Sequence, residues 1–479
     1  MPLDKQAESI TTRQRGKGMQ MSEKVSPILV SGFRDTDPAD MIAKQRLIDE
    51  IMAVYRSFGF EPLDTAVVQL QTVLFEEFEY TDMDFFQVEN SRKFSHSEAP
   101  RMALRFDLTV PLARYVAANI ATLPRPFKRA QIGKVYRGEK AQAGRYCEFL
   151  QADIDSLFTG SVYSDAEIVA VMFTLFKKLG IDKFKIVINN RMICNLFPQY
   201  AGFNPDDLTA VLRVLDKIRK VSREETVKGL SHKQDEESKN PVRFLSNSSI
   251  RKLMYLIEKQ GSNEDLLIYL KVKYQRAGLD TTGIVELEKM YEYCRMMGVD
   301  DKNLQVDFAM VRGLAYYTGP IFETYLTELP EFGSVFSGGR YDNLVSKFTE
   351  ANVPATGASV GVDRLFEALK QLSYLKPLGS VVDVMIMVLD RSYMPEYLLM
   401  AKEIRDNGYN VMIYDGVDMS FKTQLMRAVT NDIHFVVIVG KDEMDKQVVT
   451  VKDLKTRKQS VLSRNEFTTY HFLNIITGT

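Results

Sequence analysis

Four arginines stand beside glycine in segments where a bound anion could reach them. They are Arg137 in Tyr-Arg-Gly-Glu, Arg312 in Val-Arg-Gly-Leu-Ala-Tyr-Tyr-Thr-Gly, Arg340 in Ser-Gly-Gly-Arg-Tyr-Asp and Arg364 in Gly-Val-Asp-Arg-Leu. Glycine lets a ligand approach the backbone closely, and a guanidinium can bind two phosphate oxygens at once. A single arginine of this kind is more often the partner of a carboxylate in a salt bridge. Four such contexts together favour a phosphate-binding site.

The sequence lacks the motifs of several other chemistries. It contains no GxSxG, HExxH, Walker or GxGxxG pattern, and its four histidines lie outside the arginine segments. The candidate site therefore offers cations and carboxylates without a protein nucleophile. This inventory fits phosphoryl or nucleotidyl transfer, in which the protein positions the substrates and stabilises charge. The substrate would bring its own nucleophile.

The elements that must position these residues begin after a polar start. Residues 1–27 show no hydrophobic periodicity and no signal-peptide core, and we expect them to be disordered. Apolar residues between positions 47 and 58 then recur at helical spacing, and Gly59 predicts the end of that helix.

Paired short strands follow in sequence order. Residues 73–80 and 101–112 predict one antiparallel hairpin region, and residues 132–137 and 148–155 predict another around a polar loop. Sequential antiparallel pairs favour an α+β domain over a stack of βαβ units.

The composition changes near residue 206, where strand signals end, and this predicts a helical module inserted between two sheet-forming halves. Positions 213–259 hold 12 basic and 7 acidic residues, and helical periodicity extends to about residue 298. The basic excess leaves two interpretations open, an ordinary solvated helical face and a surface that contacts nucleic acid. Strand-like segments return at 305–325.

The end of the chain alternates strands and helices after a linker at 376–380, which predicts a small α/β domain with a partly parallel sheet. The predicted division is a disordered segment at 1–27, a catalytic domain at 28–205 and 301–376, a helical insertion at 206–300 and an α/β domain at 381–479.

The composition is that of an ordinary globular protein. Of 479 residues, 45% are hydrophobic and 26% are charged, and the net charge is −1, which argues against a uniformly basic surface. The three cysteines, Cys147, Cys194 and Cys294, form no CxxC pair and cannot build a disulfide framework, so we expect a cytoplasmic location. No apolar run reaches the roughly 18 residues that a membrane span needs.

Six segments together resemble histidyl-tRNA synthetases, which are class II aminoacyl-tRNA synthetases. They are Leu-Arg-Phe-Asp-Leu-Thr at 104–109, Tyr-Arg-Gly-Glu at 136–139, Glu-Phe-Leu-Gln at 148–151, Arg-Gly-Leu-Ala-Tyr-Tyr-Thr-Gly at 312–319, Gly-Gly-Arg-Tyr-Asp at 338–342 and Gly-Val-Asp-Arg-Leu at 361–365. The resemblance spans about residues 27–450. It implies an antiparallel catalytic sheet flanked by helices, with a helical insertion and a C-terminal α/β anticodon-binding domain.

The resemblance also implies the substrates and a mechanism. ATP with Mg²⁺ would activate L-histidine to histidyl-adenylate, and the histidyl group would pass to the 3′ end of tRNA-His. Arg137 would bind the α-phosphate and Glu139 the adenine amino group, while Arg145 and Arg364 would bind the γ-phosphate end. Arg312 would stabilise the reacting phosphorus. Class II relatives also imply a homodimer.

Histidine recognition follows from the same resemblance. Asp155 and Tyr317 would accept from the imidazole, and Asp107 and Gln151 would hold the α-ammonium. The implied histidine-binding set is Asp107, Gln151, Asp155, Arg312, Tyr316 and Tyr317. Because neighbours on a strand point to opposite faces, we expect only one of the two tyrosines, Tyr317, to face the substrate.

Two departures from the family concern the region that the tRNA acceptor end would approach. Lys140-Ala141-Gln142 stands where relatives have Arg-Pro-Gln, and Ala315 stands where they often have Asp. We therefore expect adenylation to be intact and reading of the acceptor end to be atypical.

Other functions remain as alternatives. One is a catalytically inactive relative that serves as a regulatory subunit or a tRNA sensor. A second is a class II synthetase for another amino acid, and a third is a nucleic-acid-binding protein without catalysis. Retention of Arg137, Arg312, Arg364 and the tail domain argues against the first, and the Tyr-Tyr-Thr-Gly segment argues against the second. The third leaves the arginine contexts unexplained.

Overall fold

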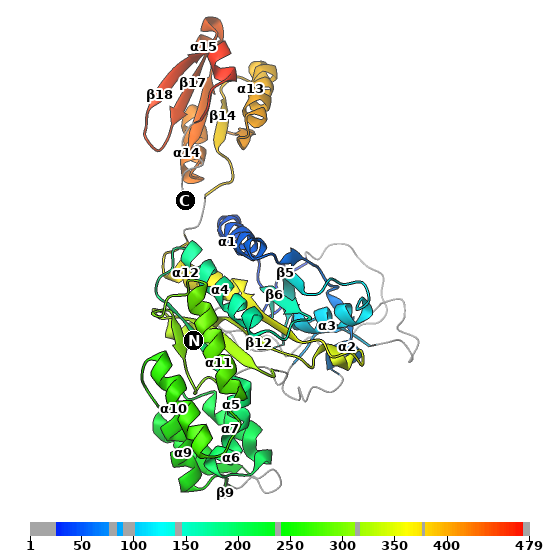
Figure 1. The fold of residues 1–479 in the computed structure, drawn as a ribbon. Helices are drawn as coiled ribbons and strands as arrows, with labels where there is room; N and C mark the ends of the chain where they lie inside the picture. Colours follow the sequence, from blue (N-terminus) through cyan, green and yellow to red (C-terminus); the bar gives the residue numbers. More distant parts are fainter. Residues whose placement is uncertain are drawn as a thin grey trace.

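The structure, a computed structural model, describes residues 25–75, 84–89, 101–138, 146–234, 241–311, 317–375 and 379–472. The segment expected to be disordered, 1–27, lies almost entirely outside the described residues. Figure 1 shows a large body that contains the described residues from 25 to 375 and a smaller domain formed by residues 379–472. None of the described helices is long and apolar enough to cross a membrane.

The large body is built on an eight-stranded sheet in the order β1-β5-β6-β13-β12-β11-β7-β10. The strands are β1 (Glu61–Pro62), β5 (Phe127–Tyr136), β6 (Glu148–Leu157), β7 (Phe184–Asn190), β10 (Leu304–Val306), β11 (Pro320–Leu326), β12 (Ser334–Arg340) and β13 (Ala355–Gly361). The pairs β1–β5 and β7–β10 are parallel, and the pairs between them are antiparallel. The predicted antiparallel pair around the second polar loop, β5 with β6, is confirmed.

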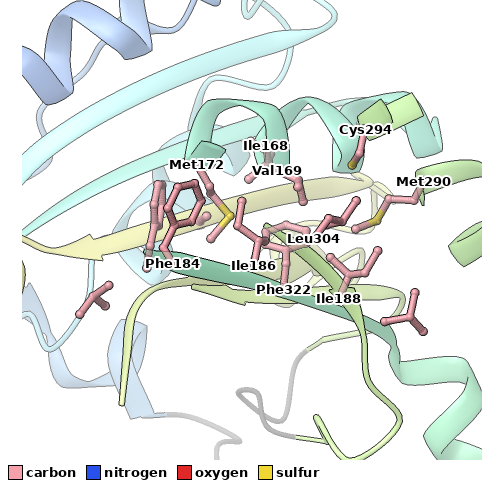
Figure 2. Packing of buried hydrophobic residues seen from close by; sticks show 14 of the residues in the cluster. Ile168, Val169, Met172, Phe184, Ile186, Ile188, Met290, Cys294, Leu304 and Phe322 are labelled. Atoms are coloured by element: carbon pink, nitrogen blue, oxygen red, sulfur yellow. The ribbon is translucent and has the colours of Figure 1, made fainter. Parts of the chain in front are cut away.

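One face of this sheet is apolar and is covered by helices. Strand register places Ala130, Ile154, Ala358, Phe322 and Ile188 in one row across it. The covering helices are α1 (Pro38–Ser57), α4 (Val162–Lys178), α11 (Thr282–Met296) and α12 (Val362–Gln371). Figure 2 shows side chains of α4 and α11 packed on β7, β10 and β11. Burial of such side chains stabilises the fold by about 1.5–3 kcal/mol each.

The sequence explains where α1 and α4 begin and end. Pro38 opens α1, where a missing N–H costs no hydrogen bond, and Gly59 follows its end at a φ of +79°. The N-cap of α4 is Ser161, whose side chain accepts a hydrogen bond from the backbone N–H of Tyr163. The helix predicted from residues 47–58 is thus confirmed as the second half of α1.

A small three-stranded sheet replaces the first predicted hairpin. It consists of β2 (Val68–Leu70), β3 (Gln87–Val88) and β4 (Met102–Leu104) in the order β2-β4-β3. The prediction of strands at 73–80 and 101–112 is wrong in part, because α2 (Gln71–Phe75) and α3 (Thr109–Ala118) occupy parts of both ranges. Short apolar runs fit a strand or a buried helix equally well, and Pro111 is tolerated because it lies in the first turn of α3.

The region between β7 and β10 is mostly helical, as predicted. Its helices are α5 (Arg191–Asn195), α6 (Phe197–Ala201), η2 (Pro205–Asp207), α7 (Leu208–Leu215), α8 (Arg223–Ser231), α9 (Asn247–Ile257), α10 (Asn263–Arg276) and α11. It also contains a two-stranded sheet that the periodicity did not reveal, β8 (His232–Gln234) with β9 (Pro241–Arg243). The last helix, α11, returns to pack against α4 and β7 of the catalytic sheet.

The C-terminal domain has a five-stranded sheet in the order β15-β14-β16-β17-β18. Its elements are β14 (Val384–Val388), η5 (Arg391–Tyr393), α13 (Met394–Asp406), β15 (Val411–Ile413), α14 (Phe421–Thr430), β16 (Phe435–Val439), α15 (Lys441–Lys446), β17 (Val448–Asp453), β18 (Gln459–Ser463) and α16 (Arg464–Thr468). The strand β14 pairs in parallel with β15 and β16, and the other pairs are antiparallel. The predicted partly parallel α/β domain is confirmed.

Candidate active site

The face of the catalytic sheet opposite the helices carries polar groups and glycines, and we call it the polar face. One row across it joins Arg129 on β5, Asp155 on β6 and Gly357 on β13. The next row joins Gln131, Asp153 and Ser359 on the same three strands. Side chains two residues apart on a strand share a face, so β6 alone presents Gln151, Asp153 and Asp155 side by side.

Asp155 is held on the polar face by two side chains. Its Oδ2 lies 2.8 Å from Nη2 of Arg129, a side chain with 0% exposure, and its Oδ1 accepts a hydrogen bond from the hydroxyl of Tyr341. Arg129 Nη2 also donates to the carbonyl of Leu108 at 3.2 Å. A Cβ at position 357 would overlap Asp155 Oδ1, so only glycine leaves room for this carboxylate. Asp155 is therefore fixed in place before any substrate binds.

Tyr341 and Arg129 were not among the expected site residues. Tyr341 follows Arg340 in the Gly-Gly-Arg-Tyr-Asp segment, so a signal for it was present in the sequence. Arg129 has no such motif, and only the pairing of β5 with β6 reveals that it faces Asp155.

Asp107 and Gln151 each keep a buried oxygen without a partner among the described residues. Asp107 Oδ1 accepts the backbone N–H of Val110 at 3.2 Å, but its Oδ2 accepts none. Gln151 Nε2 donates to Ser359 Oγ at 3.0 Å, while its Oε1 is unpaired. Burial raises the pKa of Asp107 to about 6, although the Val110 N–H and the charge of Arg137 oppose this shift. Unmet buried acceptors of this kind cost stability unless a ligand supplies donors.

Arg137 lies just beyond the end of β5 and next to Asp107. Its Nε donates to the carbonyl of Phe106 at 3.1 Å, and its guanidinium lies 5.2 Å from the ring centroid of Phe149. The side chain is only half-buried. A cation therefore stands beside the carboxylate expected to hold the α-ammonium.

Arg364 lies in the first turn of α12, where Nη1 donates to the carbonyl of Ser334 at 2.9 Å. The preceding residue, Asp363, connects this turn to other elements of the domain through two ion pairs and a hydrogen bond. Its carboxylate lies 2.5 Å from Lys44 Nζ and 3.0 Å from Arg34 Nη2, and it accepts the Leu150 N–H at 2.6 Å. Burial disfavours the charged carboxylate, but these partners outweigh it and lower the pKa of Asp363.

Tyr317 is half-buried and its phenol lies among the carboxylates of the polar face. Burial, together with the charges of Asp155, Glu323 and Asp153, raises its pKa above the ordinary value. A Cβ at Gly339 would come 2.9 Å from Tyr317 Cδ1, so this glycine makes room for the ring. That Tyr317 faces the substrate stays a prediction.

Arg340 does not belong to the polar face. Its guanidinium is buried against Asp165, with Nη2 2.6 Å from Oδ2, and it donates to the carbonyls of Thr159 and Ser161, both at 3.0 Å. These partners hold the turn that begins α4. The phosphate-binding interpretation of the four arginine contexts does not extend to Arg340.

Several expected site residues lie outside the described residues. They are Arg312, Tyr316, Glu139 and Arg145, together with the departures at Lys140-Ala141-Gln142 and Ala315. The described residues that were expected in the site lie on the polar face or at its border: Asp107, Arg137, Gln151, Asp155, Tyr317 and Arg364. Within the described parts of the chain, no three His, Cys, Asp or Glu side chains come together in a group that could hold a metal ion.

A mixed, largely antiparallel sheet with one helix-covered face, followed by a separate α/β domain, places the chain among the class II aminoacyl-tRNA synthetases. Within that class the match is specific. Residues 32–365 match the family model described as histidyl-tRNA synthetase, and residues 383–471 match the model of an anticodon binding domain. The chain belongs to the histidyl-tRNA synthetase family.

Individual relatives agree over nearly the full length. The chain is 38% identical over 435 residues to the histidine--tRNA ligase of Rhodopirellula baltica, which covers 91% of this chain and 95% of that protein. It is 35% identical over 440 residues to the ligase of Wolinella succinogenes, covering 91% and 96%. The crystal structure of histidyl-tRNA synthetase from Nostoc sp. is similar at a TM-score of 0.81 and 29% identity, covering 93% and 99%. These matches do not favour the regulatory-subunit alternative.

Proposed function

We propose that the chain activates L-histidine with ATP and transfers the histidyl group to the 3′ end of tRNA-His. The observation that carries this proposal is which side chains on and beside the polar face already have partners and which do not. Asp155 is locked by Arg129 and Tyr341, whereas Asp107 Oδ2 and Gln151 Oε1 are buried acceptors without partners among the described residues. Histidine brings N–H donors at both its ammonium and its imidazole, and so fits acceptors at two separate points.

Each part of histidine then has its own partners. Asp107 and Gln151 accept from the α-ammonium, and Asp155 with Tyr317 holds the imidazole. A site that hydrogen-bonds a polar side chain rejects analogues lacking it by about 10⁴-fold or more, since its buried groups would otherwise stay unpaired. This arrangement accounts for selectivity without editing. Arg312 and Tyr316 complete the proposed histidine-binding set on the strength of the family resemblance.

The arginines act on ATP. Arg137, beside Asp107, binds the α-phosphate close to the histidine carboxylate, and Arg364 binds the γ-phosphate end from the start of α12. Glu139, Arg145 and Arg312 have the roles that the resemblance implies, with Arg312 at the reacting phosphorus. A carboxylate oxygen of histidine attacks the α-phosphorus, the bond to the bridging oxygen breaks, and pyrophosphate leaves. The guanidinium groups stabilise the charge that develops.

In the second step the hydroxyl of the 3′-terminal ribose of tRNA attacks the carbonyl carbon of histidyl-adenylate, and AMP leaves. Residues 383–471 would bind the anticodon, as their match to the anticodon-binding model suggests. The basic excess of the helical insertion favours contact with the same tRNA.

Further points belong to this proposal. Mg²⁺ would neutralise phosphate charge, and it would be held mainly by ATP, because Mg²⁺ commonly takes one or two carboxylates plus substrate phosphates. The enzyme would be a homodimer, as in other class II synthetases. A cytoplasmic location is in keeping with three cysteines that are free and buried. The domain division at residues 206, 300 and 381 also stays a prediction.

The test is ATP–pyrophosphate exchange with each of the twenty amino acids in the absence of tRNA. We expect exchange with histidine alone, followed by charging of tRNA-His when tRNA is added. Exchange with a different amino acid would overturn the specificity. Absence of exchange from folded protein would favour the inactive regulatory relative instead.

A further inference from the structure

Asp153 is a buried carboxylate on the polar face to which neither the sequence nor the resemblance gave a role. It lies on β6 between Gln151 and Asp155 and shares their face of the sheet. Its cross-strand neighbours are Gln131 on β5 and Ser359 on β13. Only 2% of the residue is exposed.

Asp155 and Asp107, whose charges act on Asp153, each have a cation beside them, but Asp153 has none of its own. Asp155 pairs with Arg129 at 2.8 Å, and Arg137 lies beside Asp107. No ion pair joins Asp153 to any described residue, and its Oδ1 accepts no hydrogen bond from them. A buried carboxylate without a cation is costly, so its retention needs a compensating charge from elsewhere. Burial, only partly offset by Arg129, raises the pKa of Asp153 to about 7.

Asp153 also lies beside a partly exposed part of the polar face. Ser359, directly opposite it on β13, is half-buried, and so is Ser337, which pairs with Ser359 on β12. Their neighbours along both strands on the apolar face, including Ala358 and Phe336, are buried. A small polar ligand could therefore reach the position of Asp153.

Asp107 Oδ2, Gln151 Oε1 and Asp153 Oδ1 are buried acceptor oxygens on or beside this face that lack partners among the described residues. An ammonium group has three N–H donors and one positive charge. Resting on the proposed function, we propose that Asp153 binds the α-ammonium of histidine together with Asp107 and Gln151, and supplies the negative charge that balances it.

The experiment compares three ligands on the full-length chain by calorimetry. L-Histidine has both ammonium and carboxylate, L-histidinol keeps the ammonium and lacks the carboxylate, and imidazolepropionate keeps the carboxylate and lacks the ammonium. We expect Asp153→Asn to weaken binding of histidine and histidinol by about 10- to 100-fold, since the ammonium would donate to a neutral amide instead of a carboxylate. Imidazolepropionate should bind the variant equally well or more tightly, because a repelling carboxylate is gone. In exchange assays KM for histidine should rise while KM for ATP stays constant.

A matched control is Asp165→Asn, which neutralises a buried carboxylate that pairs with Arg340 at the start of α4. A structural defect of that kind should change the affinity of all three ligands by a similar factor. If Asp153→Asn weakens all three equally, or weakens none, the inference is wrong. Asp153→Ser, also neutral, repeats the comparison if the Asn variant does not fold. Wild-type protein that fails to exchange with histidine would instead contradict the proposed function itself.

Discussion

Two buried glutamines, one in the C-terminal domain and one in the catalytic domain, differ in how completely their side-chain polar atoms are hydrogen-bonded. In the C-terminal domain, Gln424 on α14 is 0% exposed and fully paired. Its Oε1 accepts the Val388 N–H at 2.8 Å, and its Nε2 donates to the carbonyls of Val388 and Met419 at 2.7 and 2.9 Å. In the catalytic domain, Gln151 pairs through Nε2 alone, and its buried Oε1 has no partner among the described residues.

The same difference holds for the strands around them. All five residues of β14 and of β16 are buried and apolar, with hydrophobic clusters on both faces of the sheet. The strand β6, buried from Gln151 to its end at Leu157, carries Gln151, Asp153 and Asp155 on one face. Polar groups that the protein satisfies stabilise a fold, whereas unsatisfied ones cost stability and are retained where a ligand completes them. The catalytic sheet therefore gives up stability for binding, and the C-terminal sheet does not.

The largest expected effect comes from breaking the ion pair between Arg129 and Asp155 on the polar face. Arg129→Leu leaves Asp155 buried without its cation, and we expect unfolding in urea, followed by circular dichroism, to show a loss of about 3–5 kcal/mol. The matched control is Arg223→Leu, because Arg223 forms an exposed pair with Glu258 at 2.7 Å, where little change is expected. Similar small losses in both variants would mean that the Arg129–Asp155 pair does not organise this face.

The next effect separates a ligand-binding arginine from a structural one. Arg137→Ala should lower the rate of histidine-dependent exchange by about 10²- to 10³-fold, as expected for loss of one group that stabilises transition-state charge. The melting temperature should change little, because this guanidinium is half-buried at the border of the site. Arg340→Ala should differ by lowering the melting temperature, since its guanidinium is buried against Asp165. A tenfold or smaller loss of exchange in Arg137→Ala contradicts the assigned role.

The stability that the buried carboxylates of the polar face cost the protein should also depend on pH. Folding raises the pKa of Asp153 from its ordinary 3.8 to about 7, and the main cause is burial of the carboxyl group. Between these values the folded protein binds more protons than the unfolded chain, so stability falls as the pH rises from about 4 to about 7. Asp153→Asn removes the part of this dependence that Asp153 contributes. The unliganded variant should match wild type near pH 4 and exceed it above pH 7 by roughly 2–3 kcal/mol, because Asp107 and Asp155 share the titration.

The measurement is the free energy of unfolding of both proteins in urea at several pH values. Asp390→Asn in the C-terminal domain is the control, since that carboxylate is exposed and caps a turn through Ser392. A constant difference between wild type and Asp153→Asn at all pH values would show that Asp153 does not titrate in this range.

The same contrast explains what could be predicted from the sequence. The C-terminal domain follows hydrophobic periodicity closely, because the alternation of strands and helices expected after the linker is found in the order β14, α13, β15, α14 and β16. Each of these elements buries its apolar residues in the ordinary way, so pattern and structure agree. The region of α2 and α3 was predicted less well, because its short apolar runs do not distinguish helix from strand.

The candidate site was only partly predictable. The resemblance pointed to Asp107, Gln151 and Asp155, and the alternation Gln-x-Asp-x-Asp on β6 was the available signal for Asp153. Arg129 could not be found in this way, because its partner is 26 positions away and the two meet only through the register of β5 with β6. Polar residues on a buried strand face thus mark a site in the sequence, while the charges that balance them depend on strand pairing.

The smallest expected effect tests the two glutamines directly. Gln424→Ala should cost about 1–3 kcal/mol of stability in the C-terminal domain, because the Val388 N–H loses its partner in the interior. Exchange without tRNA should be unaffected. Gln151→Ala should cost less than about 1 kcal/mol, since it removes one hydrogen bond to Ser359 but also an unpaired buried oxygen. Its effect should appear instead as a higher KM for histidine in exchange assays. Equal losses of stability in the two variants would contradict the proposal that the unpaired oxygen of Gln151 accepts a hydrogen bond from a ligand.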